Sequence, residues 1–113
     1  MKTHWVGAEE DIDKLNMLLG EKYIGVDSEW RPQLTYYHNS RPALLQLSSR
    51  TDVFLVDLFN LSRVKALDDI LSQIFADKRT TIIGFGFDAD IEMFTRKLYR
   101  MRFIKYIRNF IDA

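Results

Sequence analysis

The sequence predicts a single α/β domain built on a mixed β-sheet that helices flank. Two observations indicate this class. Three short segments typical of β-strands follow one another in the first half, and a fourth lies between two segments with helical periodicity. Successive strands joined by turns favour antiparallel pairing, whereas strands that alternate with helices favour parallel pairing. The sheet is therefore expected to combine an antiparallel meander with parallel strands.

The first half of the chain predicts one helix and three strands. Ile12, Leu15 and Leu19 form an apolar stripe in the expected helix over residues 7–22, and Gly20 ends it. The loop expected at residues 31–42 contains two prolines. The expected strands cover residues 22–30, 43–49 and 52–58, and the last two form a hairpin.

The second half predicts a helix, a strand and a second helix. Ser62 is the expected cap of a helix over residues 62–77, with Val64, Leu67, Leu71 and Ile74 on one face. A strand is expected at residues 80–87. Asp88 is the expected cap of a helix over residues 89–101, in which Ile91, Phe94 and Leu98 point inward. The pattern of residues 102–113 leaves open whether the helix continues or a strand forms at residues 109–113.

Composition bounds the class of protein. The 113 residues are 47% hydrophobic and 28% charged, which suits one globular domain over residues 1–113. No apolar run is long enough to cross a membrane, and the first residues lack the apolar stretch of a signal peptide. The absence of cysteine excludes a disulfide framework and a thiolate metal site. An intracellular location, nuclear or cytoplasmic, is expected.

Two carboxylates stand inside the expected strand at residues 22–30. Because side chains alternate between faces, Asp27 and Glu29 project from one face near the end of the strand, opposite Val26 and Ser28. Ligands bind at such strand ends in open α/β sheets. Hard divalent cations such as Mg²⁺ and Mn²⁺ prefer oxygen ligands. The alternative is that both acids point to solvent, where Arg31 pairs with them.

A second acidic cluster begins the helix that follows residues 80–87. Asp88, Asp90 and Glu92 lie in its first turn, where the helix dipole favours acids. Capping explains Asp88 but leaves Asp90 without a role, so Asp90 is a candidate to face the Asp27 and Glu29 pair. Gly84 and Gly86 would permit a close approach of the backbone here.

Three segments together resemble a known family. They are "IGVDSEW", "ALLQLSS" with "VFLVDL", and "IIGFGFDADIEMF". In this order and spacing the chain is similar to the DEDD-superfamily 3′–5′ exonucleases of the ribonuclease D and Werner-syndrome exonuclease type, over residues 7–113. Asp27 and Glu29 match the Asp-x-Glu of the first motif, and Asp90 matches the aspartate of the second.

The resemblance implies a ribonuclease H-like fold and phosphodiester hydrolysis from a 3′ end with two metal ions, Mg²⁺ or Mn²⁺. Asp27, Glu29 and Asp90 would be the catalytic residues and metal ligands: Asp27 would bridge both ions, Glu29 would hold one, and Asp90 would hold the other directly or through water. The implied substrate is RNA or single-stranded DNA. No sequence feature specifies a protein partner.

The third family motif, Tyr or His followed four residues later by Asp, is missing. Asp112 is the only acid after Glu92, and Arg108 stands four residues before it. The fold is therefore expected to be truncated, as a fragment of a longer protein or a shortened homologue, with the fragment favoured. A non-catalytic module that binds nucleic acid or protein is the alternative function.

Two further segments are candidates for nucleic-acid contact. Residues 95–113 interleave six basic side chains with aromatic ones, although an amphipathic helix that packs Leu98, Met101, Phe103 and Ile107 inward is the favoured explanation of the pattern. The loop beside the first motif is the other segment, although an ordinary surface loop needs no such role. Its candidate side chains are Arg31, Tyr36, Tyr37, His38 and Arg41.

Overall fold

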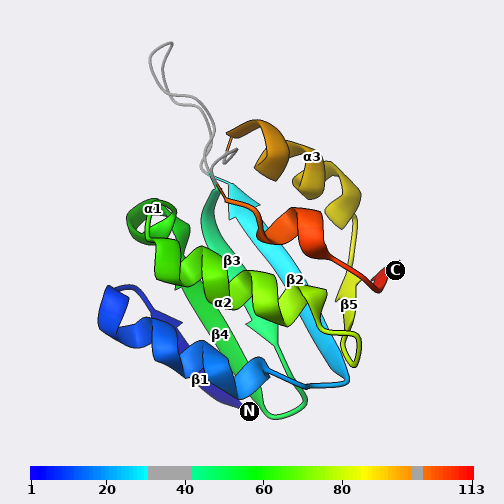
Figure 1. Ribbon diagram of the computed structural model, residues 1–113, viewed down its shortest axis with the longest axis horizontal. Helices are drawn as coiled ribbons and strands as arrows, with labels where there is room; N and C mark the ends of the chain where they lie inside the picture. The colour runs from blue at the N-terminus through cyan, green and yellow to red at the C-terminus, as the bar shows by residue number, and fades with distance from the viewer. Residues whose placement is uncertain (31–41, 98–100) are drawn as a thin grey trace.

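Six strands form one mixed sheet in the order β1-β4-β3-β2-β5-β6 (Figure 1). The structure is a computed structural model that describes residues 1–30, 42–97 and 101–113. Strands β2, β3 and β4 pair antiparallel, whereas β1 runs parallel to β4, and β5 runs parallel to β2 and β6. The predicted mixed sheet is therefore confirmed. The strands are β1 (Lys2–Val6), β2 (Tyr23–Trp30), β3 (Pro42–Ser48), β4 (Asp52–Asp57), β5 (Thr81–Gly84) and β6 (Phe110–Asp112).

Helices cover one face of this sheet. In Figure 1, η1 and α2 lie side by side in front of the strands, and η2 lies beyond α2. No helix in the described part of the chain is long and apolar enough to cross a membrane. The helices are η1 (Glu9–Leu18), α1 (Leu58–Leu61), α2 (Lys65–Ala76), α3 (Phe87–Lys97) and η2 (Phe103–Tyr106).

The core lies between the sheet and this helical layer. Alternate strand residues point into it, and Ile24, Leu45 and Phe54 from three neighbouring strands are fully buried. Leu71 of α2 and Phe103 of η2 are fully buried from the other side. Burial of such side chains contributes about 1.5–3 kcal/mol each, so this layer holds the sheet in a fixed shape.

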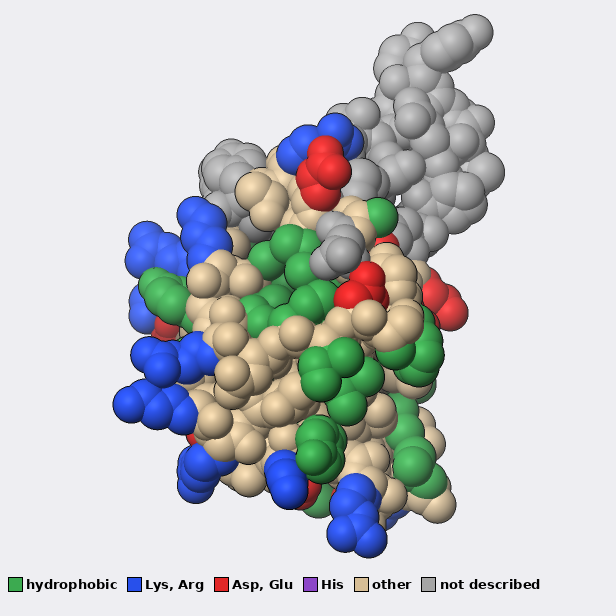
Figure 2. Space-filling model, turned by 90° about the vertical axis from the view of Figure 1, so that its right-hand side faces the viewer, with side chains coloured by type: hydrophobic (Ala, Val, Ile, Leu, Met, Phe, Trp, Pro, Cys, Tyr) green, Lys and Arg blue, Asp and Glu red, His purple; other side chains and the backbone are tan. Residues whose placement is uncertain are grey.

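The opposite face of the sheet, here called the open face, stays accessible. Trp5 and Tyr23 are 52% and 49% exposed, and Ile111 is 53% exposed. Strand pairing sets Trp5 beside Leu55, Leu55 beside Gln46, and Gln46 beside Asp27. Figure 2 shows the molecule from the side, with the open face along its right-hand edge. Hydrophobic and acidic side chains lie along that edge, whereas Lys and Arg gather along the left-hand edge. The open face is thus apolar, with acids at one end.

The first helix has a tighter winding than the sequence pattern predicts. Residues Glu9–Leu18 form a 3₁₀-helix, which has three residues per turn. Ile12, Leu15 and Leu18 are therefore the residues that face the core, and Leu19 is exposed. The prediction of Leu19 as part of the buried stripe is wrong because it assumed the α-helical period.

Other element boundaries also differ from the predictions. Ser62 ends the short helix α1, and α2 begins only at Lys65, because the chain first makes the turn that Asp57 caps through the Asn60 N–H at 3.2 Å. Strand β1 was not predicted, since its pairing with β4 joins segments far apart in the sequence. Residues Phe110–Asp112 form the strand that the sequence left open.

Candidate active site on strand β2 and helix α3

Strand β2 presents Asp27 and Glu29 on the open face. Both side chains are exposed, whereas Ile24 and Val26 are buried on the covered face, as the alternation predicts. Asp27 lies opposite Gln46 of β3, and the register of the pair shifts after Glu29. Two residues of a strand span about 7 Å, so the two carboxylates are close neighbours.

Few groups in the described part of the chain engage these two carboxylates. Asp27 Oδ1 accepts a hydrogen bond from the backbone N–H of Ser28 at 2.8 Å. Among the described residues, no side chain forms a hydrogen bond or ion pair with Glu29. Exposed carboxylate oxygens without a cationic partner are suited to a hard divalent cation.

Asp90 lies in the first turn of α3 and reaches the same strand. Its half-buried carboxylate accepts a hydrogen bond through Oδ2 from the hydroxyl of Ser28 at 2.8 Å. Ser28 is the residue between Asp27 and Glu29, but its side chain points to the opposite face of β2. The structure therefore brings all three predicted acids to one end of β2. They approach that end from both sides of the strand.

Two glycines allow α3 to begin directly after β5. A Cβ atom on Gly84 would lie 2.6 Å from the Cβ atom of Phe87, so the close approach needs glycine there, as predicted. Gly86 has open space around it but a φ of 63°, a conformation that glycine adopts without strain. This turn sets the position of the first helical residues and hence of Asp90.

The start of α3 is held by a residue other than the predicted cap. The helix begins at Phe87, so Asp88 lies inside its first turn and the prediction that Asp88 caps it is wrong. Instead, Asp112 of β6 accepts a hydrogen bond from the Phe87 N–H at 3.2 Å. A carboxylate satisfies an otherwise unpaired N–H and interacts favourably with the helix dipole.

A chain of aromatic rings attaches α3 to the rest of the domain. Phe94 of α3 lies edge-on to Phe103 of η2 at 5.5 Å, and Phe103 meets Phe75 of α2 at 5.1 Å in the same manner. Phe87 lies 6.1 Å from Phe94 and 6.1 Å from Phe110 of β6, and the rings of both pairs are tilted rather than edge-on. Edge-to-face pairs of this kind add about 0.5–1.5 kcal/mol beyond simple burial, so α3 is a firmly held element.

The comparison with protein families decides the identity of this arrangement. A family model described as 3′–5′ exonuclease matches residues 3–113. The chain belongs to the 3′–5′ exonuclease family. This membership confirms the DEDD-type resemblance of ribonuclease D that the three sequence segments indicated.

Relatives of this exonuclease domain are much longer proteins. Exonuclease mut-7 of Caenorhabditis elegans is 36% identical over 75 residues, which cover 62% of this chain and 8% of that protein. Its Homo sapiens homolog is 29% identical over 98 residues, which cover 80% of this chain and 11% of that protein. The chain thus spans about a tenth of the length of these relatives.

Solved structures confirm the ribonuclease H-like exonuclease fold. The Aedes aegypti Nibbler EXO domain superposes with a TM-score of 0.79 at 21% identity, over 97% of this chain and 52% of that one. Trypanosoma brucei RNase D in complex with RNA U12 gives 0.77 at 21% identity, over 98% of this chain and 37% of that one. The predicted fold class is therefore correct.

The donor set of this exonuclease domain fits a divalent metal ion in part. Asp27 and Glu29 supply exposed oxygen atoms on one side of β2, which suits Mg²⁺ or Mn²⁺. Within the described residues, however, no three His, Cys, Asp or Glu side chains gather as a group that could hold a metal ion. Asp90 contacts Ser28, the residue between Asp27 and Glu29, but it does not form such a group with these two acids.

Two residues of this neighbourhood were missed as site residues by the sequence interpretation. Ser28 was assigned to the buried face with Ile24 and Val26, and a hydroxyl on that apolar face is the signal that it has a polar partner. In the sequence, Asp112 stands out only as the last acid, without the Tyr or His of the third motif four residues before it. Its contact with Phe87 depends on the parallel pairing of β5 and β6, which no local pattern indicates.

The other predicted contact segments have different outcomes. Phe103 is fully buried against Phe75, and Met101 is buried, which supports inward packing for that part of the basic segment. Tyr106 is 46% exposed. Among the residues of this segment whose burial is described, the exposed basic ones are Arg96, Arg102, Lys105 and Arg108. The loop candidates Arg31, Tyr36, Tyr37, His38 and Arg41 lie outside the described residues.

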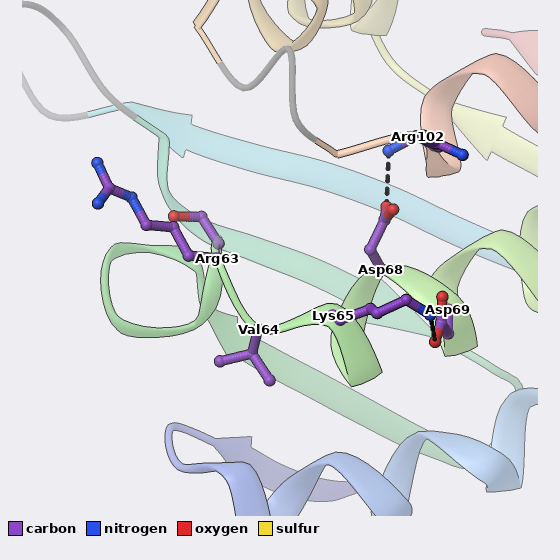
Figure 3. A pocket seen from close by; sticks show the side chains of 7 residues that line it. Arg63, Val64, Lys65, Asp68, Asp69 and Arg102 are labelled. Atoms are coloured by element: carbon purple, nitrogen blue, oxygen red, sulfur yellow. Dashed lines mark hydrogen bonds and ion pairs between the residues drawn. The ribbon is translucent and has the colours of Figure 1, made fainter.

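A separate pocket of about 320 Å³ lies between the α1–α2 turn and Arg102 (Figure 3). Its acids already have partners. Asp68 accepts hydrogen bonds from the backbone N–H groups of Arg102 at 2.7 Å and Phe103 at 3.0 Å, and Asp69 pairs with Lys65 at 3.0 Å. Asp68 thus anchors η2 to α2, which is a structural role.

Proposed function

We propose that this domain removes nucleotides from the 3′ end of RNA or single-stranded DNA by metal-dependent hydrolysis. The observation that supports this most is the placement of Asp27 and Glu29, exposed and adjacent on β2, with Asp90 bonded to the residue between them. Membership of the 3′–5′ exonuclease family supplies the reaction class. RNA is the favoured substrate, since RNase D of Trypanosoma brucei, a protein of similar fold, was solved with RNA.

Asp27, Glu29 and Asp90 would hold the metal ions. Mg²⁺ or Mn²⁺ bound there would supply Lewis-acid activation of water and stabilisation of the leaving oxygen. The carboxylates of Asp27 and Glu29 offset the positive charge, and their attachment to the central strand β2 fixes their separation. Helix α3 brings the third acid from the other side of the strand and keeps it in place through its aromatic contacts.

A second candidate is a non-catalytic module that binds RNA or a protein. One observation favours it: the described residues include no group of three side chains arranged to hold a metal ion. The two candidates differ in their dependence on Mn²⁺. A metal-dependent exonuclease requires the ion to shorten RNA, whereas a binding module does not shorten RNA with or without it.

The test uses 5′-labelled single-stranded RNA and DNA of one sequence, incubated with the chain and Mn²⁺. The proposal expects a ladder of shortened products, reduced roughly 100-fold or more in Asp27→Asn and Glu29→Gln, because each loses a ligand worth several kcal/mol. Asp13→Asn, which changes an exposed acid on η1, is the matched control and should retain activity.

Binding measurements separate the candidates if shortening fails. Mn²⁺ binding followed by electron paramagnetic resonance reports the metal site without turnover, and fluorescence anisotropy reports RNA binding. Shortening that survives Asp27→Asn would overturn the proposed catalytic role of that residue. RNA binding that is unaffected by Mn²⁺, with no shortened product, would instead support the non-catalytic module.

A further inference from the structure

We infer that Ser28 is a positioning residue that couples Asp90 to Asp27 at the exonuclease site. This inference rests on the proposed function and extends it to a residue outside the three acids. The Ser28 hydroxyl donates a hydrogen bond to Asp90 Oδ2 at 2.8 Å, and its backbone N–H donates to Asp27 Oδ1 at 2.8 Å. One residue therefore contacts two of the three acids through two different donors.

The place of Ser28 in the strand explains how it does so. Its side chain shares the covered face of β2 with Ile24 and Val26, which are buried. Its two neighbours, Asp27 and Glu29, point to the open face. The hydroxyl of Ser28 reaches Asp90 of α3, whereas the backbone N–H of Ser28 contacts Asp27 on the open face. The strand itself thus connects the acids on its two sides.

The hydrogen bond restricts the rotation of the Asp90 side chain. An aspartate in the first turn of a helix has several staggered rotamers, and its carboxylate group turns easily about the terminal bond. A bond from a hydroxyl to a carboxylate is charge-assisted and stronger than a neutral one. By directing Oδ2 toward β2, Ser28 selects one rotamer of Asp90 before any ligand arrives.

Such selection matters because catalytic groups must be held within about 0.5 Å of the productive geometry. Residues that orient metal ligands typically change metal affinity or activity by about 10–100-fold when they are removed. The effect of Ser28 is expected in that range. Since Ser28 acts through the acids, the change should fall on the metal requirement and kcat, with a smaller change in the KM for RNA.

Three substitutions test the hydroxyl separately from the shape of the side chain. Ser28→Ala removes the hydroxyl, and Ser28→Thr keeps it on a β-branched residue that strands accommodate. Valine has nearly the same shape as threonine but no hydroxyl, so Ser28→Val cannot donate a hydrogen bond to Asp90. The comparison of Thr with Val therefore isolates the hydrogen bond. Ser72→Ala on α2 is a control for loss of a serine elsewhere in the domain.

The measurements are kcat and KM on 5′-labelled single-stranded RNA, the Mn²⁺ concentration for half-maximal rate, and Mn²⁺ binding by electron paramagnetic resonance without RNA. Ser28→Ala and Ser28→Val are expected to lower kcat and weaken Mn²⁺ binding by about 10–100-fold, while Ser28→Thr stays within about threefold of wild type. Thermal unfolding of each variant confirms that the fold is kept.

The outcomes distinguish this inference from the proposed function. If Ser28→Ala and Ser28→Val keep the wild-type kcat and Mn²⁺ binding while Asp27→Asn loses both, the role of Ser28 is overturned. The proposed metal site would then still stand. Equal loss in Ser28→Thr and Ser28→Val would also overturn it, because the hydroxyl would then be irrelevant. A wild-type chain that neither binds Mn²⁺ nor shortens RNA would overturn both.

Discussion

The carboxylate of Asp112 accepts a hydrogen bond from the backbone N–H of Phe87 at 3.2 Å, so strand β6 holds the first residue of helix α3. The pairing of Gly84 with Asp112 brings the two together, because β6 lies directly beside the strand that leads into the helix. This contact and the Ser28–Asp90 bond secure two positions in the first turn of α3. The first turn of α3 is therefore supported from two strands.

Replacement of Asp112 should destabilise the domain. Asp112→Ala is expected to lower the free energy of unfolding by about 0.5–2 kcal/mol, the usual effect of losing a helix cap. Asp112→Asn should lose less, because it keeps an oxygen acceptor but not the charge that favours the helix N-terminus. Urea denaturation gives the values. Asp13→Ala, an exposed acid of η1, is the control, and an equal loss in that variant would contradict the capping role.

The two glycines before α3 should respond differently to a side chain. Gly84→Ala places a Cβ atom 2.6 Å from that of Phe87, so it is expected to cost about 1–3 kcal/mol through displacement of the helix start. A Cβ atom on Gly86 would meet no atom within 4 Å, and asparagine tolerates the left-handed backbone, so Gly86→Asn should cost about 1 kcal/mol or less. Thermal unfolding of both variants checks this order, which the reverse ranking would refute.

Adjacent leucines test the winding of η1. Leu18 is fully buried and Leu19 is 37% exposed. Leu18→Ala is expected to lower the free energy of unfolding by about 2–5 kcal/mol, as for other buried leucines, whereas Leu19→Ala should cost less than about 1 kcal/mol. Guanidinium denaturation measures both. A larger loss from Leu19→Ala would show that the helix has the α-helical register that the sequence predicted.

The sequence was informative wherever a local pattern carries the structure. The alternation in β2 predicted that Asp27 and Glu29 share one face, and the glycines at the end of β5 predicted a close approach of the backbone there. The sequence was not informative where the structure depends on contacts between segments far apart in the chain. The pairing of β1 with β4 and the contact of Asp112 with Phe87 join residues far apart in the chain. Because neither leaves a periodic signal, no local pattern could predict them.

Acid should weaken one ion pair in a defined range of pH. Asp77 accepts hydrogen bonds from Arg79 through both carboxylate oxygens, at 3.0 Å from Nε and 2.8 Å from Nη2, and these bonds lower the pKa of Asp77 to about 2. A lowered pKa stabilises the fold above the ordinary value of 3.8, and this contribution is lost as pH falls through about 2.

The difference in unfolding free energy between wild type and Asp77→Asn should therefore be largest above pH 4 and shrink as the pH falls to about 2. Urea titrations at pH 5, 4, 3 and 2 measure it, with buffers matched in ionic strength. Asp69→Asn, which breaks the exposed pair with Lys65, is the matched control for loss of a surface ion pair. A difference that grows toward pH 2 would contradict the sign.

The order of strands has a consequence for how the chain acquires its structure. Strands β2, β3 and β4 are neighbours in sequence, and contacts of this kind form early, whereas β5 joins β2 only after the intervening 50 residues, 31–80, have been bridged. Asp27 and Glu29 thus belong to the early part of the sheet. Asp90 follows β5 in the chain, so we expect the three acids to come together only after β2, β3 and β4 have paired. A chain stalled during synthesis would already expose the first two carboxylates but lack the third.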